Sequence, residues 1–109
     1  MSLTLEEINE KRHEMFNNYV TTTLQVISVG APEKKEKNGN ELTLTLVKGF
    51  AQNALVDITI WNKEFPEEYL GKMVTFDGFR VKMLTNNTFV LVSTVFSNFN
   101  IVHGEMEAE

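Results

Sequence analysis

The chain has 109 residues, of which 42% are hydrophobic and 23% charged, and its formal net charge is -5. This composition suits one domain with a substantial core and excludes a fibrous protein. No apolar run is long enough to span a bilayer, and the N-terminus lacks the cationic start and apolar stretch of a signal peptide. The absence of cysteine excludes a disulfide scaffold, a thiol nucleophile and a Cys-ligated zinc site, and it leads us to expect an intracellular protein, cytoplasmic or nuclear.

The first segment has the signature of a helix start. Thr4 is a candidate N-cap, and Glu7 follows three residues later, which makes a capping box. Apolar residues then recur at helical spacing as far as Tyr19. The pattern predicts an amphipathic helix over residues 4–18, within an N-terminal segment of residues 1–19.

The rest of the chain predicts five strands and one short helix. Runs of β-branched and apolar residues, several with strict alternation, cover residues 20–29, 42–46, 55–61, 73–83 and 89–99. Asn38-Gly39 is a hairpin-turn signal inside a polar loop, and residues 49–54 predict a second turn. Residues 65–70 predict a single helical turn, because Pro66 suits its first position. Gly78 predicts a bulge or a sharp bend in the fourth strand.

Acidic residues are concentrated at the two ends of the sequence. Residues 1–18 contain four Glu against Lys11 and Arg12, and the last ten residues add three Glu. Between Tyr19 and Phe99, eight basic residues balance eight acidic ones. We therefore predict a neutral folded core followed by an acidic, disordered tail over residues 101–109.

Five strands with a short helix between the third and the fourth are typical of the oligonucleotide/oligosaccharide-binding barrel, or OB-fold. A β-sandwich usually needs more strands, and a βαβ protein needs longer crossover helices. We therefore predict an all-β fold, a five-stranded OB-fold β-barrel over residues 20–100 with flanking helices.

Two aromatic residues suggest what such a barrel binds. Alternation puts Trp61 on the same face of the third strand as Asp57 and Thr59, opposite an apolar face. Phe89 opens the fifth strand, just past a polar turn. An aromatic ring on the open face of a small barrel can stack on any base, so the pattern favours single-stranded nucleic acid as the ligand. Each ring taken alone is also compatible with packing in the core.

Other phenylalanines leave alternatives open. Phe76 is most simply placed inside the barrel, whereas Phe79 shares a face with Asp77 and is a candidate third exposed aromatic. Phe96 and Phe99 are three residues apart, so they cannot both face inward on one ideal strand.

Several short motifs occur in a fixed order between Val56 and Phe99. They are a strand that ends in an aromatic and a polar residue, an acidic and aromatic short helix, a β-run after Gly-Lys, a Lys between apolar residues, and an Asn-containing turn that leads to Phe. Here these are Ile58-Thr59-Ile60-Trp61-Asn62, Glu64-Phe65-Pro66-Glu67-Glu68-Tyr69-Leu70, Gly71-Lys72-Met73-Val74-Thr75-Phe76, Val81-Lys82-Met83 and Thr85-Asn86-Asn87-Thr88-Phe89. In this order the stretch resembles the single-strand DNA-binding OB domains of the replication protein A large subunit and related single-strand-binding proteins. The resemblance implies a role in DNA replication or repair, with DNA favoured over RNA as the partner.

The resemblance also implies which residues bind. In that family, aromatic residues at the positions of Trp61 and Phe89 stack on successive bases, and a lysine at the position of Lys82 contacts the nucleic-acid backbone. The chain departs from the family at Asp57, where a basic residue is often found and where a carboxylate would repel phosphate. Nearby basic side chains are further candidates to neutralise phosphates, and two asparagines to donate hydrogen bonds; this set is Arg80, Lys63, Lys34, Lys35, Lys37, Asn62 and Asn87.

Catalysis finds little support in the sequence. The two histidines lie in the predicted helix and in the tail, and neither a nucleophile elbow nor a Gly-rich phosphate loop is present. We predict no enzyme activity, no cofactor, no metal and no membrane partner. The alternative function is a protein-interaction OB module, acting as a subunit of a larger nucleic-acid-binding or replication complex. The net acidity, Asp57 and the apolar side of the N-terminal helix favour it, and that helix is also a candidate surface for self-association.

Overall fold

Two short helices precede the barrel in the computed structural model, which describes residues 2–102. α1 (Leu5–Glu10) and α2 (Arg12–Met15) replace the single helix expected over residues 4–18, because the backbone of Lys11 departs from helical geometry. The predicted capping box is confirmed. The Thr4 hydroxyl accepts a hydrogen bond from the Glu7 N–H at 3.1 Å, and the Glu7 carboxylate accepts one from the Thr4 N–H at 2.8 Å.

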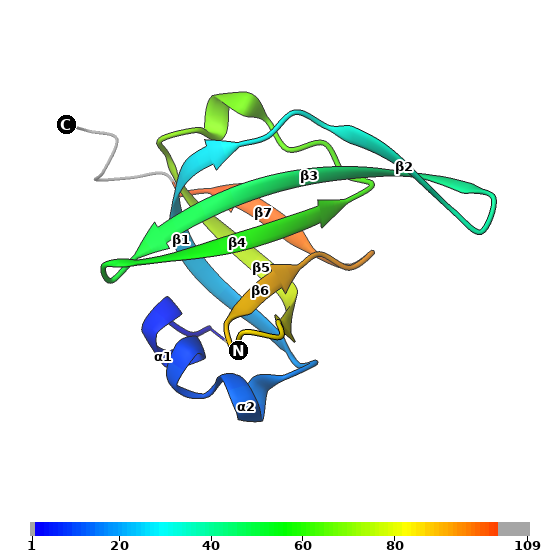
Figure 1. Cartoon of the computed structure of the whole chain (residues 1–109). Helices are drawn as coiled ribbons and strands as arrows, with labels where there is room; N and C mark the ends of the chain where they lie inside the picture. Colours follow the sequence, from blue (N-terminus) through cyan, green and yellow to red (C-terminus); the bar gives the residue numbers. More distant parts are fainter. Residues whose placement is uncertain (1, 103–109) are drawn as a thin grey trace.

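Seven strands follow within the described residues, and five of them close a barrel (Figure 1). Their bounds are β1 (Tyr19–Val29), β2 (Glu33–Lys37), β3 (Asn40–Ala51), β4 (Ala54–Trp61), β5 (Met73–Met83), β6 (Phe89–Val92) and β7 (Asn98–Ile101). The ring runs β1-β3-β4-β6-β5 and closes where β5 pairs with β1; only the β4–β6 pair is parallel. A 3₁₀ turn, η1 (Glu67–Tyr69), connects β4 to β5. The predicted OB-fold is thereby confirmed.

The core fills the barrel and extends under α1. The alternation predicted for β4 is confirmed, since Val56, Ile58 and Ile60 are all buried. Figure 1 shows α1 and α2 at one end of the barrel and η1 at the other. Leu5 and Ile8 of α1 belong to the buried core cluster. The apolar side of this helix therefore packs on the chain's own barrel.

A bulge at Gly78 decides which side chains of β5 face outward. Gly78 has φ +74°, and the β1–β5 register slips at this point, so the predicted bulge is confirmed. Phe76, two residues before Gly78, and Phe79, directly after it, both point inward and are 0% exposed. Phe79 is therefore a core residue and not a third exposed aromatic. The same slip turns Arg80 and Lys82 to the outer face of the barrel.

The strand expected over residues 89–99 is divided into β6 and β7 by a turn at residues 93–97. Hydrogen bonds between its own residues hold this turn: the Thr94 N–H donates to Ser97 Oγ at 2.7 Å, and the Phe96 N–H donates to Thr94 Oγ1 at 3.1 Å. Phe96 is 84% exposed in the turn, whereas Phe99 packs against the core. Only one of the two faces inward, as predicted.

The turn expected over residues 49–54 is confined to Gln52 and Asn53, which both have positive φ. Gly49 lies inside β3 and faces the core. A Cβ added there would lie 2.8 Å from Leu24 Cδ1. Glycine is therefore needed here for close packing between strands. From the sequence alone, a glycine with this role cannot be told from one that marks a turn.

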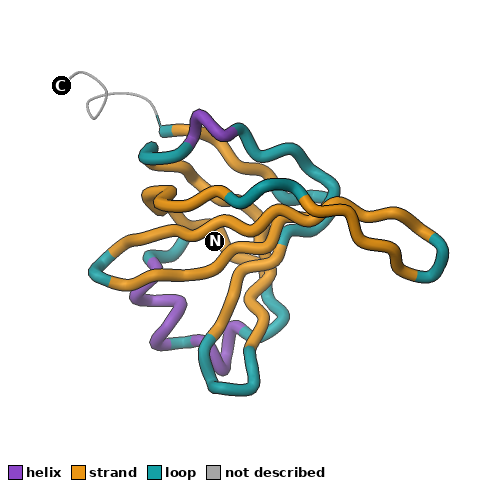
Figure 2. The backbone as a smooth tube through the Cα atoms, turned by 45° about the horizontal axis from the view of Figure 1, so that its top comes forward, coloured by secondary structure: helices purple, strands orange, loops and turns teal. Residues whose placement is uncertain are grey.

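β2 and β3 form a long hairpin that projects from the barrel (Figures 1 and 2). It turns at Asn38-Gly39, as predicted, with φ values of 53° and 81°. β2 lies within a segment that we expected to be a loop. Residues 103–109 of the predicted acidic tail lie outside the described residues, and Ile101 ends β7. None of the helices within residues 2–102 is long and apolar enough to cross a membrane.

Candidate binding groove

A groove of about 710 Å³ crosses the outer face of the barrel. Strands β2 to β6 all contribute to it. Its floor is largely aliphatic, and the side chains that form it are Leu42, Leu44 and Leu46 of β3, Val90 and Val92 of β6, and Leu84. The Leu46 side chain is about half exposed, although it sits in the middle of a strand. An open apolar floor of this kind can pack against a ligand with flat faces.

The sheet register orders the groove into rows. One row crosses four strands through Lys48, Asp57, Val90 and Lys82. Two residues further along β4, a second row runs through Leu46, Thr59, Val92 and Arg80. Trp61 lies two residues further again, opposite Leu44. The outer face of β4 therefore presents a carboxylate, a hydroxyl and an indole in succession.

The groove is positively charged although the chain is acidic. Four basic side chains line it, Lys37, Lys48, Arg80 and Lys82, and Asp57 is the single carboxylate among its described lining residues. Lys48 Nζ lies 2.9 Å from Asp57 Oδ1. Within residues 2–102 the other three basic groups form no ion pair, and Arg80 Nε is shielded from solvent without a hydrogen-bond partner. These cations are available to an anionic ligand.

Trp61 is the one aromatic side chain that lines the groove within the described residues. A backbone contact holds this residue in place, because the backbone N–H of Trp61 donates a hydrogen bond to Ser93 Oγ at 2.8 Å. The indole also borders a second hollow of about 360 Å³, formed with residues 62, 63 and 93–95. Trp61 thus stands where the two hollows meet and is partly exposed there.

Phe89, the second predicted stacking residue, does not line the groove. It shares the inner side of β6 with Leu91, which is fully buried, and it packs against the core. Val90 takes the outward position instead. Phe89 was matched to the family position as the aromatic residue that follows the polar turn. The strand alternates from its first residue, however, and this alternation turns the ring inward.

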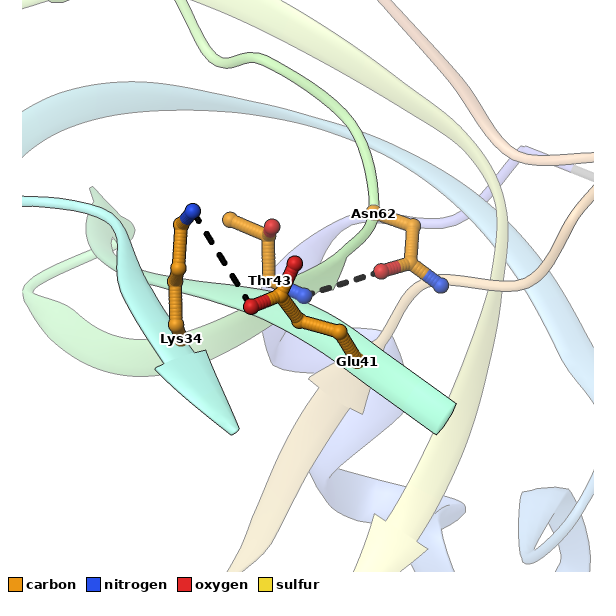
Figure 3. Close-up of polar contacts among 4 residues, drawn as sticks. All are labelled: Lys34, Glu41, Thr43 and Asn62. Carbon is orange, nitrogen blue, oxygen red and sulfur yellow. Dashed lines mark hydrogen bonds and ion pairs between the residues drawn. The ribbon is translucent and has the colours of Figure 1, made fainter. Parts of the chain in front are cut away.

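The hairpin lysines have different surroundings. Lys37 lines the groove. Lys35 pairs across the hairpin with Leu42, a groove residue, and its Nζ lies 3.4 Å from Glu33. Lys34 lies on the opposite side of the hairpin, where its Nζ is 3.9 Å from the Glu41 carboxylate (Figure 3).

The predicted polar ligands beside Trp61 and in the β5–β6 turn support the backbone. Asn62 Oδ1 accepts a hydrogen bond from the Thr43 N–H at 2.9 Å and so ties the end of β4 to β3 (Figure 3). The backbone carbonyl of Asn87 accepts one from Arg12 Nε at 3.0 Å, which anchors the turn to α2. Asn87 does not line the groove, and Lys63 lines only the second hollow.

Lys48 lines the groove but is absent from the predicted binding residues. The signal was present, because Lys48 continues the alternation of Leu42, Leu44 and Leu46 and must share their face. The expected turn at Gly49 ended the predicted strand too early for this to be noticed.

Comparisons with solved structures agree with the fold. The chain resembles the OB domain of Ta0387 from Thermoplasma acidophilum with a TM-score of 0.73 and 14% identity, over 95% of this chain and 89% of that one. It resembles the second OB-fold domain of replication protein A from Methanococcus maripaludis with a TM-score of 0.71 and 15% identity, over 96% and 98% of the two chains. A chain from a replication protein A heterotrimer bound to single-stranded DNA matches with a TM-score of 0.76 and 14% identity, over 99% of this chain and 26% of that one. No protein-family model and no curated protein sequence matches the chain.

Proposed function

We propose that this OB-fold domain binds single-stranded nucleic acid, without catalysis, in the groove to which β2 to β6 contribute. The observation that carries the proposal is the composition of the groove. In a chain with a net charge of -5, one surface gathers four basic side chains and a partly exposed tryptophan over an aliphatic floor. Phosphate neutralisation and base stacking are the two contributions that such binding needs.

Each group has a role in this proposal. The Trp61 indole stacks on a base, and the aliphatic floor supports the neighbouring bases and sugars. Lys37, Arg80 and Lys82 contact phosphates, since they form no ion pair within the described residues. Within residues 2–102, no group of three or more His, Asp or Glu side chains is placed to hold a metal ion.

The similar solved structures support the same ligand class. One of them is a replication protein A heterotrimer bound to single-stranded DNA, and another is a replication protein A domain. Shared fold alone does not carry function. The charge and aromatic content of this chain's own groove provide the independent support.

A fluorescence titration tests the proposal. Trp61 is the single tryptophan of the chain, so any change in indole emission reports on this position. We expect oligo-dT, and also oligo-U, to quench it at low salt as a base stacks on the ring. The absence of both quenching and binding at low salt would refute the proposed function.

A pair of charge reversals locates the binding surface. Lys82→Glu should weaken oligo-dT binding by on the order of tenfold at low salt, because it removes a phosphate contact and adds repulsion. Lys34→Glu is the matched control, since Lys34 lies on the other side of the hairpin. Equal effects of the two variants would mean that binding responds to overall charge and not to the groove.

One observation favours a protein-interaction role as the second candidate. Val95 and Phe96 are 81% and 84% exposed in the β6–β7 turn, next to β7 at the edge of the sheet. Adjacent exposed apolar side chains of this size are typical of protein contacts. If this role is correct, Phe96→Ser should abolish self-association or partner binding in sedimentation experiments and leave oligonucleotide binding intact.

A further inference from the structure

The ion pair of Lys48 and Asp57 has no role in phosphate binding as proposed above. It lies in the row of the groove that also contains Val90 and Lys82. Lys48 Nζ donates to Asp57 Oδ1 at 2.9 Å, and both side chains remain more than half exposed. Oδ2 of Asp57 has no hydrogen-bond partner within residues 2–102. The groove therefore presents an ammonium donor and two carboxylate acceptors side by side.

This pair is unsuited to a phosphate. A phosphodiester that approached Lys48 would come within contact distance of the Asp57 carboxylate, and like charges at that separation repel. A neutral hydrogen-bonding group is free of this repulsion. The edge of a base is therefore the better ligand for Lys48 and Asp57, while the phosphates lie near Lys82 and Arg80.

The donor and acceptors match one base better than the others. Guanine carries the O6 acceptor, the N1–H donor and the N2–H donor in sequence along its Watson–Crick edge, which is available in a single strand. The Asp57 carboxylate accepts from N1–H and N2–H together, and Lys48 Nζ donates to O6. Thymine presents one donor between two carbonyls, so the second carboxylate oxygen would face an acceptor. Cytosine and adenine each offer a single donor group next to one ring acceptor.

We propose that Asp57 and Lys48 form a base-recognition subsite that prefers guanine. This inference rests on the proposed binding of single-stranded nucleic acid in the same groove. Asp57, which appeared in the sequence as an obstacle to phosphate binding, becomes the residue that sets base preference.

Fluorescence anisotropy with a labelled oligo-dT of about nine nucleotides, within the usual site size of an OB domain, tests the inference. Two further oligomers replace one central thymidine by deoxyguanosine or by deoxyinosine, which lacks the N2 amino group. Flanking thymidines let the substituted base shift into register with Asp57. We expect the guanosine oligomer to bind at least about fivefold more tightly than oligo-dT, the lower end for a bidentate contact, with inosine between them.

Variants assign the preference to the pair. Asp57→Asn should abolish the preference for guanosine while binding oligo-dT somewhat more tightly, because it removes a negative charge from the groove. Lys48→Gln should reduce the preference through loss of the O6 contact. Glu68→Gln is the control: it removes one negative charge, as Asp57→Asn does, from an exposed residue on η1. It should leave the relative affinities for the three oligomers unchanged.

The outcomes separate the two proposals. If wild-type protein binds oligo-dT and the guanosine oligomer equally, or if the preference survives in Asp57→Asn, the subsite is refuted and groove binding stands. If no oligomer binds at low salt, the proposed function is refuted and the subsite with it. Circular dichroism melting of each variant verifies that it is folded at the assay temperature.

Discussion

β4 ends and β6 begins with an aromatic residue, and both strands contribute to the groove, yet the two rings face opposite ways. Trp61 points outward between two hollows, while Phe89 packs against the core with Leu91. Both orientations follow from the alternation of inward and outward side chains along each ring's own strand. Proximity to a binding surface is therefore no guide to a residue's role. The inward or outward position within the strand decides whether an aromatic ring stabilises the fold or is available to a ligand.

Truncation of Phe89 should have the largest effect, and it should act on stability. Phe89→Ala removes a ring that is partly buried against the core, so we expect a loss of roughly 3 kcal/mol of unfolding free energy, at the low end for such changes. Chemical denaturation measures it. Phe96→Ala is the matched control and should cost less than about 0.5 kcal/mol, because that ring is 84% exposed. Similar costs for the two variants would contradict the inward placement of Phe89.

Truncation of Trp61 should show the opposite profile. Trp61→Ala should weaken oligo-dT binding by roughly 1–3 kcal/mol, the usual contribution of one stacked base, and should destabilise the fold less than Phe89→Ala does. Anisotropy of a labelled oligomer is the suitable measurement, since the variant has no tryptophan. A large loss of stability with unchanged affinity would assign Trp61 to packing.

The contrast between the two rings also shows how far the sequence could predict the structure. Local signals were sufficient for the capping box at Thr4, the hairpin turn at Asn38-Gly39, the bulge at Gly78 and the presence of a short helix before β5. These features depend on residues within a few positions of one another. The hydrophobic pattern alone was enough to turn Trp61 outward.

The parts of the groove that the sequence did not predict depend on long-range pairing. The Gly78 bulge moves Phe79 inward, and the size of that shift is visible only in the β1–β5 register. The pairing of Lys48 with Asp57 requires the β3–β4 register, and the role of Gly49 depends on its close approach to Leu24 of β1. Strand register, more than residue type, was the missing information.

Salt dependence should distinguish the phosphate contacts from stacking at Trp61. Three unpaired groove cations, Lys37, Arg80 and Lys82, predict a log–log salt slope on the order of -2, from ~0.7 per contact to a single strand. Arg80→Gln should make the slope shallower by about 0.7, whereas Trp61→Ala should leave it unchanged. A slope steeper than about -5 would indicate a further basic surface, such as one formed by oligomerisation.

The smallest expected effect concerns the capping box of α1, which lies at one end of the barrel. It is remote from both the phosphate contacts and the stacking residue Trp61. The pKa of Glu7 is lowered from its ordinary value of 4.5, chiefly by the hydrogen bond from the Thr4 backbone N–H and then by the one with the Thr4 hydroxyl. Because the folded pKa is the lower one, the ionised capping box stabilises the fold above about pH 4.5, and this contribution disappears as the pH falls through the folded pKa.

Glu7→Gln should remove that pH dependence. The melting temperature of the wild type should exceed that of the variant at neutral pH, and the difference should shrink as the pH is lowered from about 4.5. Glu6→Gln is the matched control, since Glu6 lies in the same first turn but takes no part in the capping box. If Glu7→Gln melts with the same pH profile as the wild type, the ionisation of Glu7 does not contribute to stability, since a Gln at this position can still form the capping box. Oligonucleotide affinity should be unaffected in both variants, because neither residue lines the groove.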